Sequence, residues 1–329
     1  MAYITLNKNN FFNNLDIIAN KTKDKDKIAL VLKDNAYGHG LLLIASMAKE
    51  YGITKAVVRS SDEARMIDEY FDYILVLADT PKVTSEKVRF TINDLKSIDN
   101  FPKGTKVELK VDTLMHRNGV CMSELEEAID KIQKQGLILE AVFTHHRSAD
   151  ELTSEWFVQN ENFKLVKQKV KELGLDNIRF HSANSASILR TENFDEDMVR
   201  VGIAAYGCLD EKEELKAVLS LKASKNSSKA LKAGQRIGYG ATYTFEEDAT
   251  VSNYDFGYAD GFLRILSNNY TAPNNEKLVG RISMDNSSFI SEEDEIVIFD
   301  DARDIAKCAK TISYEILTSL KSHIKREII

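Results

Sequence analysis

Cysteines and long apolar runs are scarce in this sequence. Cys121, Cys208 and Cys308 are odd in number and far apart, which argues against a disulfide framework and gives no paired spacing for a zinc site. Residues 1–7 lack a basic region followed by an apolar core, and no later apolar run approaches the length that spans a membrane. We therefore expect reduced thiols, no export and a cytoplasmic location.

An excess of basic residues is also missing. The formal net charge is −7, and acidic and basic residues are mixed along the chain. The sequence thus offers no basic surface for nucleic acid or an anionic membrane, and a protein that handles small molecules fits better. No low-complexity linker or longer repeat divides the 329 residues. Because single cores stop growing at roughly 250–300 residues, two domains are expected.

Short apolar or β-branched segments alternate with helical patterns through the first two thirds of the chain. This alternation is typical of repeated βα units around a parallel sheet. About eight such segments occur, which is the number that closes a barrel. The expected strands are residues 27–32, 55–59, 73–77, 87–92, 106–111, 137–143, 178–181 and 198–203.

The segments between these strands contain helix signals. Ser123 and Glu126 have the spacing of a capping box, which predicts the start of a helix. A longer helix is expected over residues 154–173, where apolar side chains recur at mostly helical spacing. Within it, Trp156 and Phe157 fit the core better than a cofactor contact.

The pattern changes after about Asp210. Alternating residues at 217–223 and β-branched and aromatic residues at 242–251 predict strands, and Ser227 and Ser228 indicate a turn. A helical pattern returns at 304–321, and residues 2–6 are expected to add a strand to the same domain. The predicted fold is α/β: a parallel (β/α)8 TIM-type barrel of residues 8–215, then a mostly β C-terminal domain of residues 216–329 plus 1–7.

Chemically reactive residues gather at the predicted strand ends, where a parallel barrel places its site. They include one lysine, three arginines and two histidines. Gathering this much positive charge at the opening of one barrel would be unfavourable without anionic ligands. A phosphorylated carbonyl cofactor and a carboxylate substrate would satisfy them. A free lysine amine forms a Schiff base with an aldehyde, whereas Lys33 taken alone is also compatible with a solvated turn. The candidates are Lys33, Arg59, Asp112, Arg117, His145, His181 and Arg200.

Nine local motifs, taken in order, resemble those of the alanine racemases, a family that uses pyridoxal 5'-phosphate on a barrel followed by a β domain. Each motif alone is weak, since the one around Tyr239 also fits a bend between strands and His181 also fits a core histidine. Together they extend from the first barrel strand nearly to the C-terminus. They are residues 33–40, 110–117, 144–151, 181–186, 200–207, 238–243, 257–261, 280–285 and 313–315.

The resemblance implies two catalytic residues. Lys33 would form the Schiff base with the cofactor and serve as one proton-transfer base, and Tyr239 would be the other. Racemisation needs such a pair because a proton removed from one face of the α-carbon must be replaced from the opposite face. A phenol ionises in water only at about pH 10, so Tyr239 needs help to act as a base near pH 7. The resemblance assigns this help to His145. A neighbouring cation would favour the phenolate form of Tyr239. Without the motif, Tyr239 would be interpreted as a packed strand aromatic.

The resemblance also places Arg200 at the pyridine nitrogen of the cofactor. A guanidinium cannot accept the ring proton, so that nitrogen would stay largely unprotonated and the ring would be a weaker electron sink. This would restrict transamination. The implied cofactor residues are Lys33, Tyr37, Arg117, His145, Ser185, Arg200, Gly202, Ile203 and Tyr314, and the implied substrate residues are Arg117, Met284 and Asp285, with Tyr258 and Tyr314 narrowing the entrance.

The function implied by the resemblance is interconversion of L-alanine and D-alanine, which supplies D-alanine for bacterial peptidoglycan. In the family, the tyrosine base and the segment matched by Met284 and Asp285 reach the cofactor from a partner subunit. A homodimer with shared active sites is therefore expected, and a monomer is the alternative.

Three other functions remain open at this point. A non-catalytic pyridoxal phosphate carrier or regulator would not need Tyr239 or the C-terminal domain. A racemase that prefers serine would use the same residues. A metal-dependent barrel hydrolase could use His145, His146 and His181, although the positive charges of Lys33 and Arg200 would lie beside the ion, and no metal ligands are predicted.

Some residues depart from the usual family pattern. Leu114 stands where glycine is usual, three residues before Arg117, and is expected to alter the arginine loop. Asp34 adds a carboxylate beside Lys33. Ser283 and Asn286 replace a common cysteine and glutamine, and Lys110 matches a lysine that is carbamylated in some members.

Overall fold

The computed structural model describes residues 1–151, 153–209 and 215–329. Its contacts divide the chain into two compact units. The barrel unit comprises Leu15–Asp34 and Leu41–Ala205, and the β unit comprises Met1–Asn14, Asn35–Gly40 and Tyr206–Ile329. The change of pattern at Asp210 falls outside the described residues, and the domain limits 8–215 and 216–329 remain predictions.

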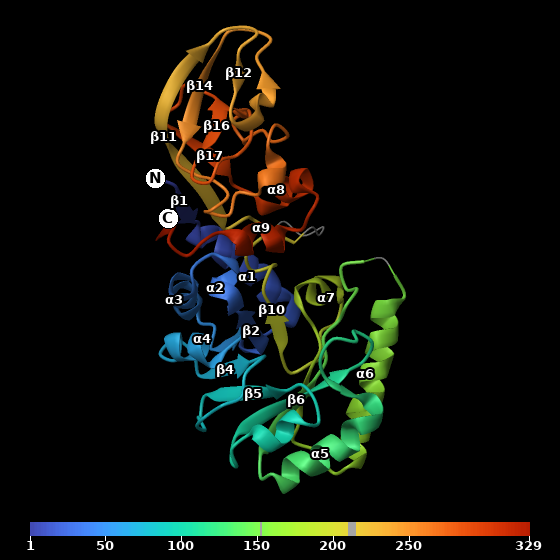
Figure 1. The fold of residues 1–329 in the computed structure, drawn as a ribbon. Helices are drawn as coiled ribbons and strands as arrows, with labels where there is room; N and C mark the ends of the chain where they lie inside the picture. The colour runs from blue at the N-terminus through green and yellow to red at the C-terminus, as the bar shows by residue number, and fades with distance from the viewer. Residues whose placement is uncertain (152, 210–214) are drawn as a thin grey trace. The chain divides into compact units, whose positions relative to one another are not determined.

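In the described residues, eight parallel strands form the barrel unit, in the order β10, β2, β3, β4, β5, β6, β8, β9 (Figure 1). Two backbone hydrogen bonds link the β9 and β10 segments, from Asp197 to Phe180 at 3.2 Å and from Arg200 to Ala183 at 3.0 Å. The barrel is thus nearly closed, and the predicted fold class is confirmed. The strands are β2 (Ile28–Val31), β3 (Lys55–Val58), β4 (Tyr73–Val76), β5 (Val88–Ile92), β6 (Lys106–Asp112), β8 (Ile138–Phe143), β9 (Arg179–His181) and β10 (Val199–Val201), with β7 (Val120–Cys121) beside β6.

Helices cover the outside of these strands, with α3 and α4 near β2 and β4 and with α5 and α6 flanking β6 (Figure 1). Every residue of β2 and β4 is buried, as expected for strands covered on both faces. In α5 the buried residues recur at helical spacing, at Leu125, Ala128, Ile129 and Ile132. The helices are α3 (Leu41–Tyr51), α4 (Ser61–Met66), α5 (Leu125–Lys134), α6 (Glu155–Glu172) and α7 (Ser185–Arg190); α1 (Lys8–Thr22) belongs to both units.

Two local predictions for this unit are wrong. The capping box pairs Cys121 with Glu124, whose carboxylate accepts the Cys121 N–H at 2.8 Å, because a short 3-10 turn precedes α5. Phe157 is 56% exposed and lies outside the core. Phe157 is exposed because it lies away from the buried face of α6. That face consists of Gln159, Phe163, Val166 and Val170.

The β unit contains a mostly antiparallel sheet in the order β15, β16, β14, β11, β1, β18, with β17 also paired to β11. Strand β1 (Tyr3–Leu6) lies between β11 and β18, which confirms that residues 2–6 add a strand. The other strands are β11 (Leu219–Leu231), β12 (Arg236–Ile237), β13 (Tyr243–Thr244), β14 (Ala249–Tyr254), β15 (Lys277–Leu278), β16 (Ser287–Ile290), β17 (Glu295–Phe299) and β18 (Lys325–Ile328), and the helices are α8 (Ala302–Ala309) and α9 (Ser313–Ser319).

The turn predicted at Ser227 and Ser228 is wrong. Both residues lie inside the long strand β11, opposite Asn253 and Ser252 of β14. The pairing instead shifts between Lys225 and Ser227, so a bulge accommodates the irregularity without ending the strand.

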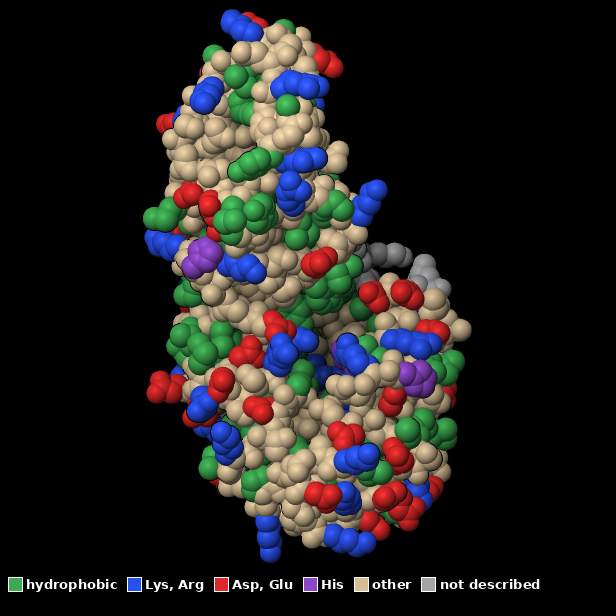
Figure 2. Space-filling view, viewed as in Figure 1, with side chains coloured by type: hydrophobic (Ala, Val, Ile, Leu, Met, Phe, Trp, Pro, Cys, Tyr) green, Lys and Arg blue, Asp and Glu red, His purple; other side chains and the backbone are tan. Residues whose placement is uncertain are grey.

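Charges on the surface are mixed, as the sequence predicts. The face in Figure 2 carries acidic and basic side chains interspersed, with no large area of a single sign. Within the described ranges, no helix combines the length and apolar character needed to cross a membrane.

Candidate active site

Lys33 follows the end of β2 and begins a turn of unusual backbone. The side chain is half-buried. The next four residues have positive φ angles, at 55° for Asp34, 57° for Asn35, 52° for Ala36 and 52° for Tyr37, so the predicted turn is the left-handed segment α2 (Lys33–Tyr37). Each non-glycine residue in this conformation costs roughly 1–2 kcal/mol, and such strain concentrates at functional sites.

His39 holds the far end of this turn. The ring is fully buried, and its Nδ1 lies 3.0 Å from the carbonyl oxygens of both Ala36 and Tyr37. Because both partners are acceptors, Nδ1 carries a proton. Burial lowers the pKa of His39 to about 4, so the ring is neutral. Gly38 is required beside it, since an added Cβ would lie 2.0 Å from the Leu317 carbonyl oxygen.

Glu63 holds the near end of the turn. Its carboxylate accepts the N–H of Asp34 and the N–H of Arg59, each at 2.7 Å, and so ties the ends of β2 and β3 together. The Arg59 guanidinium contacts Asp34 at 3.4 Å. Arg59, a strand-end candidate, therefore supports the Lys33 turn, while Glu63 is a residue that sequence reasoning missed.

Tyr37 and Tyr314, both expected near the phosphate, come together in the β unit. Their ring centres are 5.8 Å apart, and Tyr37 also lies 5.2 Å from Tyr206. Tyr206 is fully buried and stacks on His39 at 4.3 Å. The structure thus brings this part of the predicted phosphate set together.

Four cations interact in the barrel unit. Lys110 is nearly buried in β6, and its pKa falls to about 8, first through burial and then through repulsion by Arg117 and Arg200, with a smaller contribution from Lys33. The Asp112 carboxylate opposes this shift. The strand-end cations therefore share one electrostatic environment, which an anionic ligand would stabilise.

His145 is half-buried beside these cations. Burial, followed by the charges of Arg200, Lys110 and Arg117, lowers the pKa of His145 well below its ordinary value. The imidazole is therefore neutral near pH 7. A neutral His145 cannot itself supply the cation expected to favour phenolate, and the cation beside it is Arg200, whose Nη2 lies 3.4 Å from His145 Nδ1.

Arg200 is buried at the centre of the site. Its Nη2 donates to the carbonyl oxygens of Thr144 at 2.7 Å and Ser182 at 3.2 Å, and its Nη1 donates to His181 Nδ1. Its guanidinium carbon lies 5.0 Å from the centre of the Phe143 ring. Burial lowers the pKa of Arg200 to about 10, which still leaves it charged.

Ser185 gathers backbone donors. Its Oγ accepts the N–H of Gly202 at 3.0 Å and the N–H of Ala204 at 3.3 Å. Ile203, predicted from the resemblance, is buried between them. Ala204 is not among the residues that the resemblance implies, and only its backbone N–H takes part.

Leu114 precedes the exposed Arg117 and has a glycine-like backbone. Its φ is 151°, and its N–H is held by Asp112 Oδ1 at 3.0 Å, together with that of His116 at 3.1 Å. Burial raises the pKa of Asp112, but these backbone donors bring it below the ordinary value. The loop therefore keeps the conformation that suits glycine although it carries leucine.

Replacing Leu114 by glycine should stabilise the protein by about 1 kcal/mol, because the strained φ becomes allowed. Urea unfolding monitored by circular dichroism measures this free energy. Leu114→Ala is the matched control, since it shortens the side chain but keeps the strain. A glycine variant no more stable than the alanine variant would show that this backbone is not strained.

Tyr239 is 69% exposed, which contradicts its interpretation as a packed strand aromatic. It begins the 3-10 turn η4 (Tyr239–Ala241) between β12 and β13, flanked by Gly238 at φ 73° and Gly240 at φ 71°. Arg281 lies behind this turn, 3.2 Å from the position of an added Cβ on Gly240. The turn thus presents the phenol to solvent.

The segments that contain Tyr258 and Met284 lie side by side in the β unit. The N–H of Tyr258 donates to Ser283 O at 3.1 Å, and that of Ala259 donates to Met284 O at 2.9 Å. Gly257 allows this approach, because an added Cβ would lie 2.1 Å from Met284 O. Met284 is 54% exposed and Tyr258 is 42% exposed.

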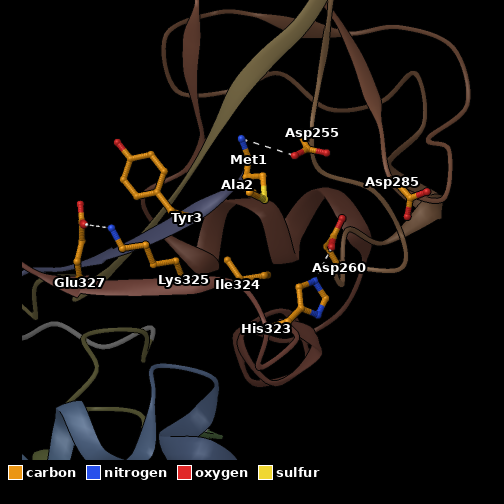
Figure 3. A pocket seen from close by; sticks show the side chains of 10 residues that line it. All are labelled: Met1, Ala2, Tyr3, Asp255, Asp260, Asp285, His323, Ile324, Lys325 and Glu327. Carbon is orange, nitrogen blue, oxygen red and sulfur yellow. Dashed lines mark hydrogen bonds and ion pairs between the residues drawn. The ribbon is translucent and has the colours of Figure 1, made fainter.

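Asp285 lines a pocket of about 740 Å³ in the β unit (Figure 3). Asp255, Asp260 and Glu327 also line it, and Asp260 lies 2.9 Å from the ring of His323. Lys325 and the N-terminal amine also line it and pair with Glu327 and Asp255, so the lining offers no excess of positive charge for a phosphate or a substrate carboxylate. None of the predicted cofactor residues is among those that line this pocket.

Both parts of the chain match known protein families. Residues 6–210 match the N-terminal domain of alanine racemase, and residues 218–328 match its C-terminal domain. The chain belongs to the alanine racemase family. An alanine racemase from a Nitratiruptor species is 44% identical over 335 aligned positions that cover 99% of each chain.

Solved structures of the family have the same fold. The alanine racemase of Clostridium difficile 630 superposes with a TM-score of 0.91 at 28% identity, covering 100% of this chain and 95% of that one. The alanine racemase of Bartonella henselae, with covalently bound pyridoxal phosphate, gives 0.87 at 26% identity, with coverage of 100% and 99%. The family is one of pyridoxal phosphate-dependent isomerases, which confirms the resemblance seen in the motifs.

The side chains of the barrel unit fit this cofactor chemically. The hydroxyl and N–H groups around Ser185 suit a phosphate, and the buried Arg200 offers donors but no acceptor to a ring nitrogen. In the described residues, no group of three or more His, Cys, Asp or Glu side chains is placed to hold an ion. His146 is engaged with Ser187 at 2.7 Å, and His181 is engaged with Glu108 and Arg200.

Proposed function

We propose that this protein is an alanine racemase that interconverts L-alanine and D-alanine with pyridoxal 5'-phosphate as cofactor. The observation that carries the proposal is the cluster of Lys33, Lys110, Arg117 and Arg200, whose mutual repulsion an anionic cofactor and a carboxylate substrate would relieve. Similarity to alanine racemases along the whole chain supports the choice of substrate.

The residues that would hold the cofactor divide by its chemical groups. Its phosphate would meet Ser185, the N–H groups of Gly202 and Ile203, and the hydroxyls of Tyr37 and Tyr314. Its ring nitrogen would face Arg200, with His145 beside that guanidinium. When bound, the cofactor withdraws electrons and so lowers the cost of removing the α-proton of an amino acid.

Lys33 and Tyr239 would move the proton. The Lys33 amine would attach the cofactor and then exchange the α-proton at one face, while the Tyr239 phenol would exchange it at the other. Arg117 would orient the substrate through its carboxylate, with Met284 and Asp285 lining the substrate side. Two bases are needed because a single base would return the proton to the face it left.

The exposed Tyr239 and Met284 also support a homodimer with shared active sites. Residues that should exclude water from a substrate are solvated in the single chain. We propose that a partner subunit's barrel covers them. We further propose that the enzyme is cytoplasmic and supplies D-alanine for peptidoglycan.

Purified protein given pyridoxal phosphate should show the visible absorbance of a cofactor bound through lysine, and it should convert L-alanine to D-alanine in a chiral chromatography assay. Serine is the comparison substrate. Cofactor binding without racemisation would favour the carrier, and faster turnover of serine would favour a serine racemase. Absence of cofactor binding would contradict the proposal.

A further inference from the structure

A buried chain of polar side chains continues from Arg200 into the barrel. Glu108, on β6, and His181, on β9, are both fully buried. His181 Nδ1 meets Arg200 Nη1, and His181 Nε2 lies 2.9 Å from Glu108 Oε2. The other oxygen of Glu108 accepts Tyr73 Oη and, at 3.0 Å, Arg179 Nη2. Glu108 is therefore joined to Arg200 through a single imidazole.

The position of the proton on His181 follows from these partners. A guanidinium only donates, so His181 Nδ1 must be the acceptor from Arg200 and must lack a proton. The proton is then on Nε2 and points at the Glu108 carboxylate. Burial lowers the pKa of His181, which agrees with a neutral ring. Burial alone would raise the pKa of Glu108, but the hydrogen bond from His181 and the charge of Arg179 hold the pKa of that carboxyl below its ordinary value.

We propose that Glu108 is a positioning residue of the racemase, which fixes the His181 tautomer and thereby sets how strongly Arg200 donates to the cofactor's ring nitrogen. This inference rests on the proposed function. An ionised carboxylate behind Nε2–H makes Nδ1 a stronger acceptor, so more of the Arg200 charge is satisfied by His181 and less is offered to the ring. The ring then remains a weak electron sink.

Replacing Glu108 by glutamine tests this arrangement sharply. The position of Oε1 faces two donors, Tyr73 and Arg179, so the amide oxygen should occupy it and the amide NH2 should face His181. His181 must then accept at Nε2 and carry its proton on Nδ1, where it opposes an Arg200 N–H. Arg200 loses that acceptor and becomes a stronger donor to the ring.

Two measurements follow the change. In the protein without cofactor, NMR of ¹⁵N-labelled histidine should show the His181 proton on Nε2 in the wild type and on Nδ1 in Glu108→Gln. In the loaded enzyme, transamination moves the amino group from L-alanine to the cofactor and yields pyruvate and pyridoxamine phosphate. Pyruvate formed per racemisation should rise about tenfold in Glu108→Gln, equivalent to ~1.4 kcal/mol in relative barrier height.

Glu140→Gln is the matched control. Glu140 accepts Arg89 Nε at 2.8 Å and Arg179 Nη2 at 3.2 Å, so this half-buried carboxylate shares Arg179 with Glu108 but does not touch His181. This variant should leave both the tautomer and the pyruvate ratio unchanged. A purely structural role for the network would make the two variants behave alike.

The wild-type spectrum alone can overturn the inference, even if Glu108→Gln does not fold. A wild-type spectrum with the His181 proton on Nδ1, or with both nitrogens protonated, would contradict the inference. An unchanged pyruvate ratio in a folded Glu108→Gln enzyme would also contradict it. Failure of the proposed function is distinguishable, because then the wild type would neither bind pyridoxal phosphate nor racemise alanine, whatever the His181 tautomer.

Discussion

Alanine at position 33 should reduce racemisation by at least about 10⁴-fold, because one substitution removes both the covalent anchor of the cofactor and a proton-transfer base. The visible band of lysine-bound cofactor should disappear at the same time. Chiral chromatography of alanine and an absorbance spectrum of the dialysed protein measure the two effects. Lys33 is suited to both roles because it is half-buried at the end of β2.

Two further variants test whether the Lys33 amine itself is needed, or only its positive charge or the intact turn around it. Lys33→Arg keeps a positive charge but supplies no amine for a Schiff base, so it should be as inactive as Lys33→Ala. Asp34→Asn alters the adjacent exposed residue of the same turn and should retain activity within about threefold. Substantial activity in Lys33→Arg would mean that this side chain acts only as a cation.

The sequence predicts the barrel strands well because their burial is nearly uniform. Segments such as Ile28–Val31 and Tyr73–Val76 are apolar throughout, and a parallel strand covered on both faces has that composition. The errors in the predicted secondary structure arise where the same residues are compatible with more than one local structure. Ser227 and Ser228 favour turns in general, yet they continue β11 because pairing with β14 satisfies their backbone.

The residues of the candidate site also divide into those that the sequence reveals and those that it does not. Side chains at strand ends, such as Arg200 and His145, are visible in the sequence because the fold places strand ends together. The left-handed turn after Lys33 is not visible: Asp34 and Asn35 tolerate positive φ angles, but Ala36 and Tyr37 rarely adopt them, and the segment contains no glycine before Gly38. Glu108 was also overlooked, because β6 alternates charged and apolar residues and nothing in that alternation shows that the charged face is buried.

Phenylalanine in place of Tyr239 should lower racemisation by about 10³-fold in both directions, because the proton at one face of the α-carbon loses its base. One enantiomer of alanine, and not the other, should still exchange its α-proton with deuterated water, since Lys33 continues to serve its own face. Proton NMR measures this exchange. Tyr243→Phe, in the neighbouring strand β13, is the control and should keep nearly full activity. Loss of exchange for both enantiomers would contradict a base that serves one face.

Hybrids of two inactive variants test whether Tyr239 acts in its own subunit. If sites are shared, a dimer of one Lys33→Ala subunit and one Tyr239→Phe subunit has one intact site and one doubly defective site. Random mixing of equal amounts should then restore about a quarter of wild-type activity, because half of the dimers are hybrids with one working site each. If each chain completes its own site, no dimer contains an intact one, and activity stays at the level of the separate variants even after subunit exchange is demonstrated. The 69% exposure of Tyr239 in the single chain favours the first result.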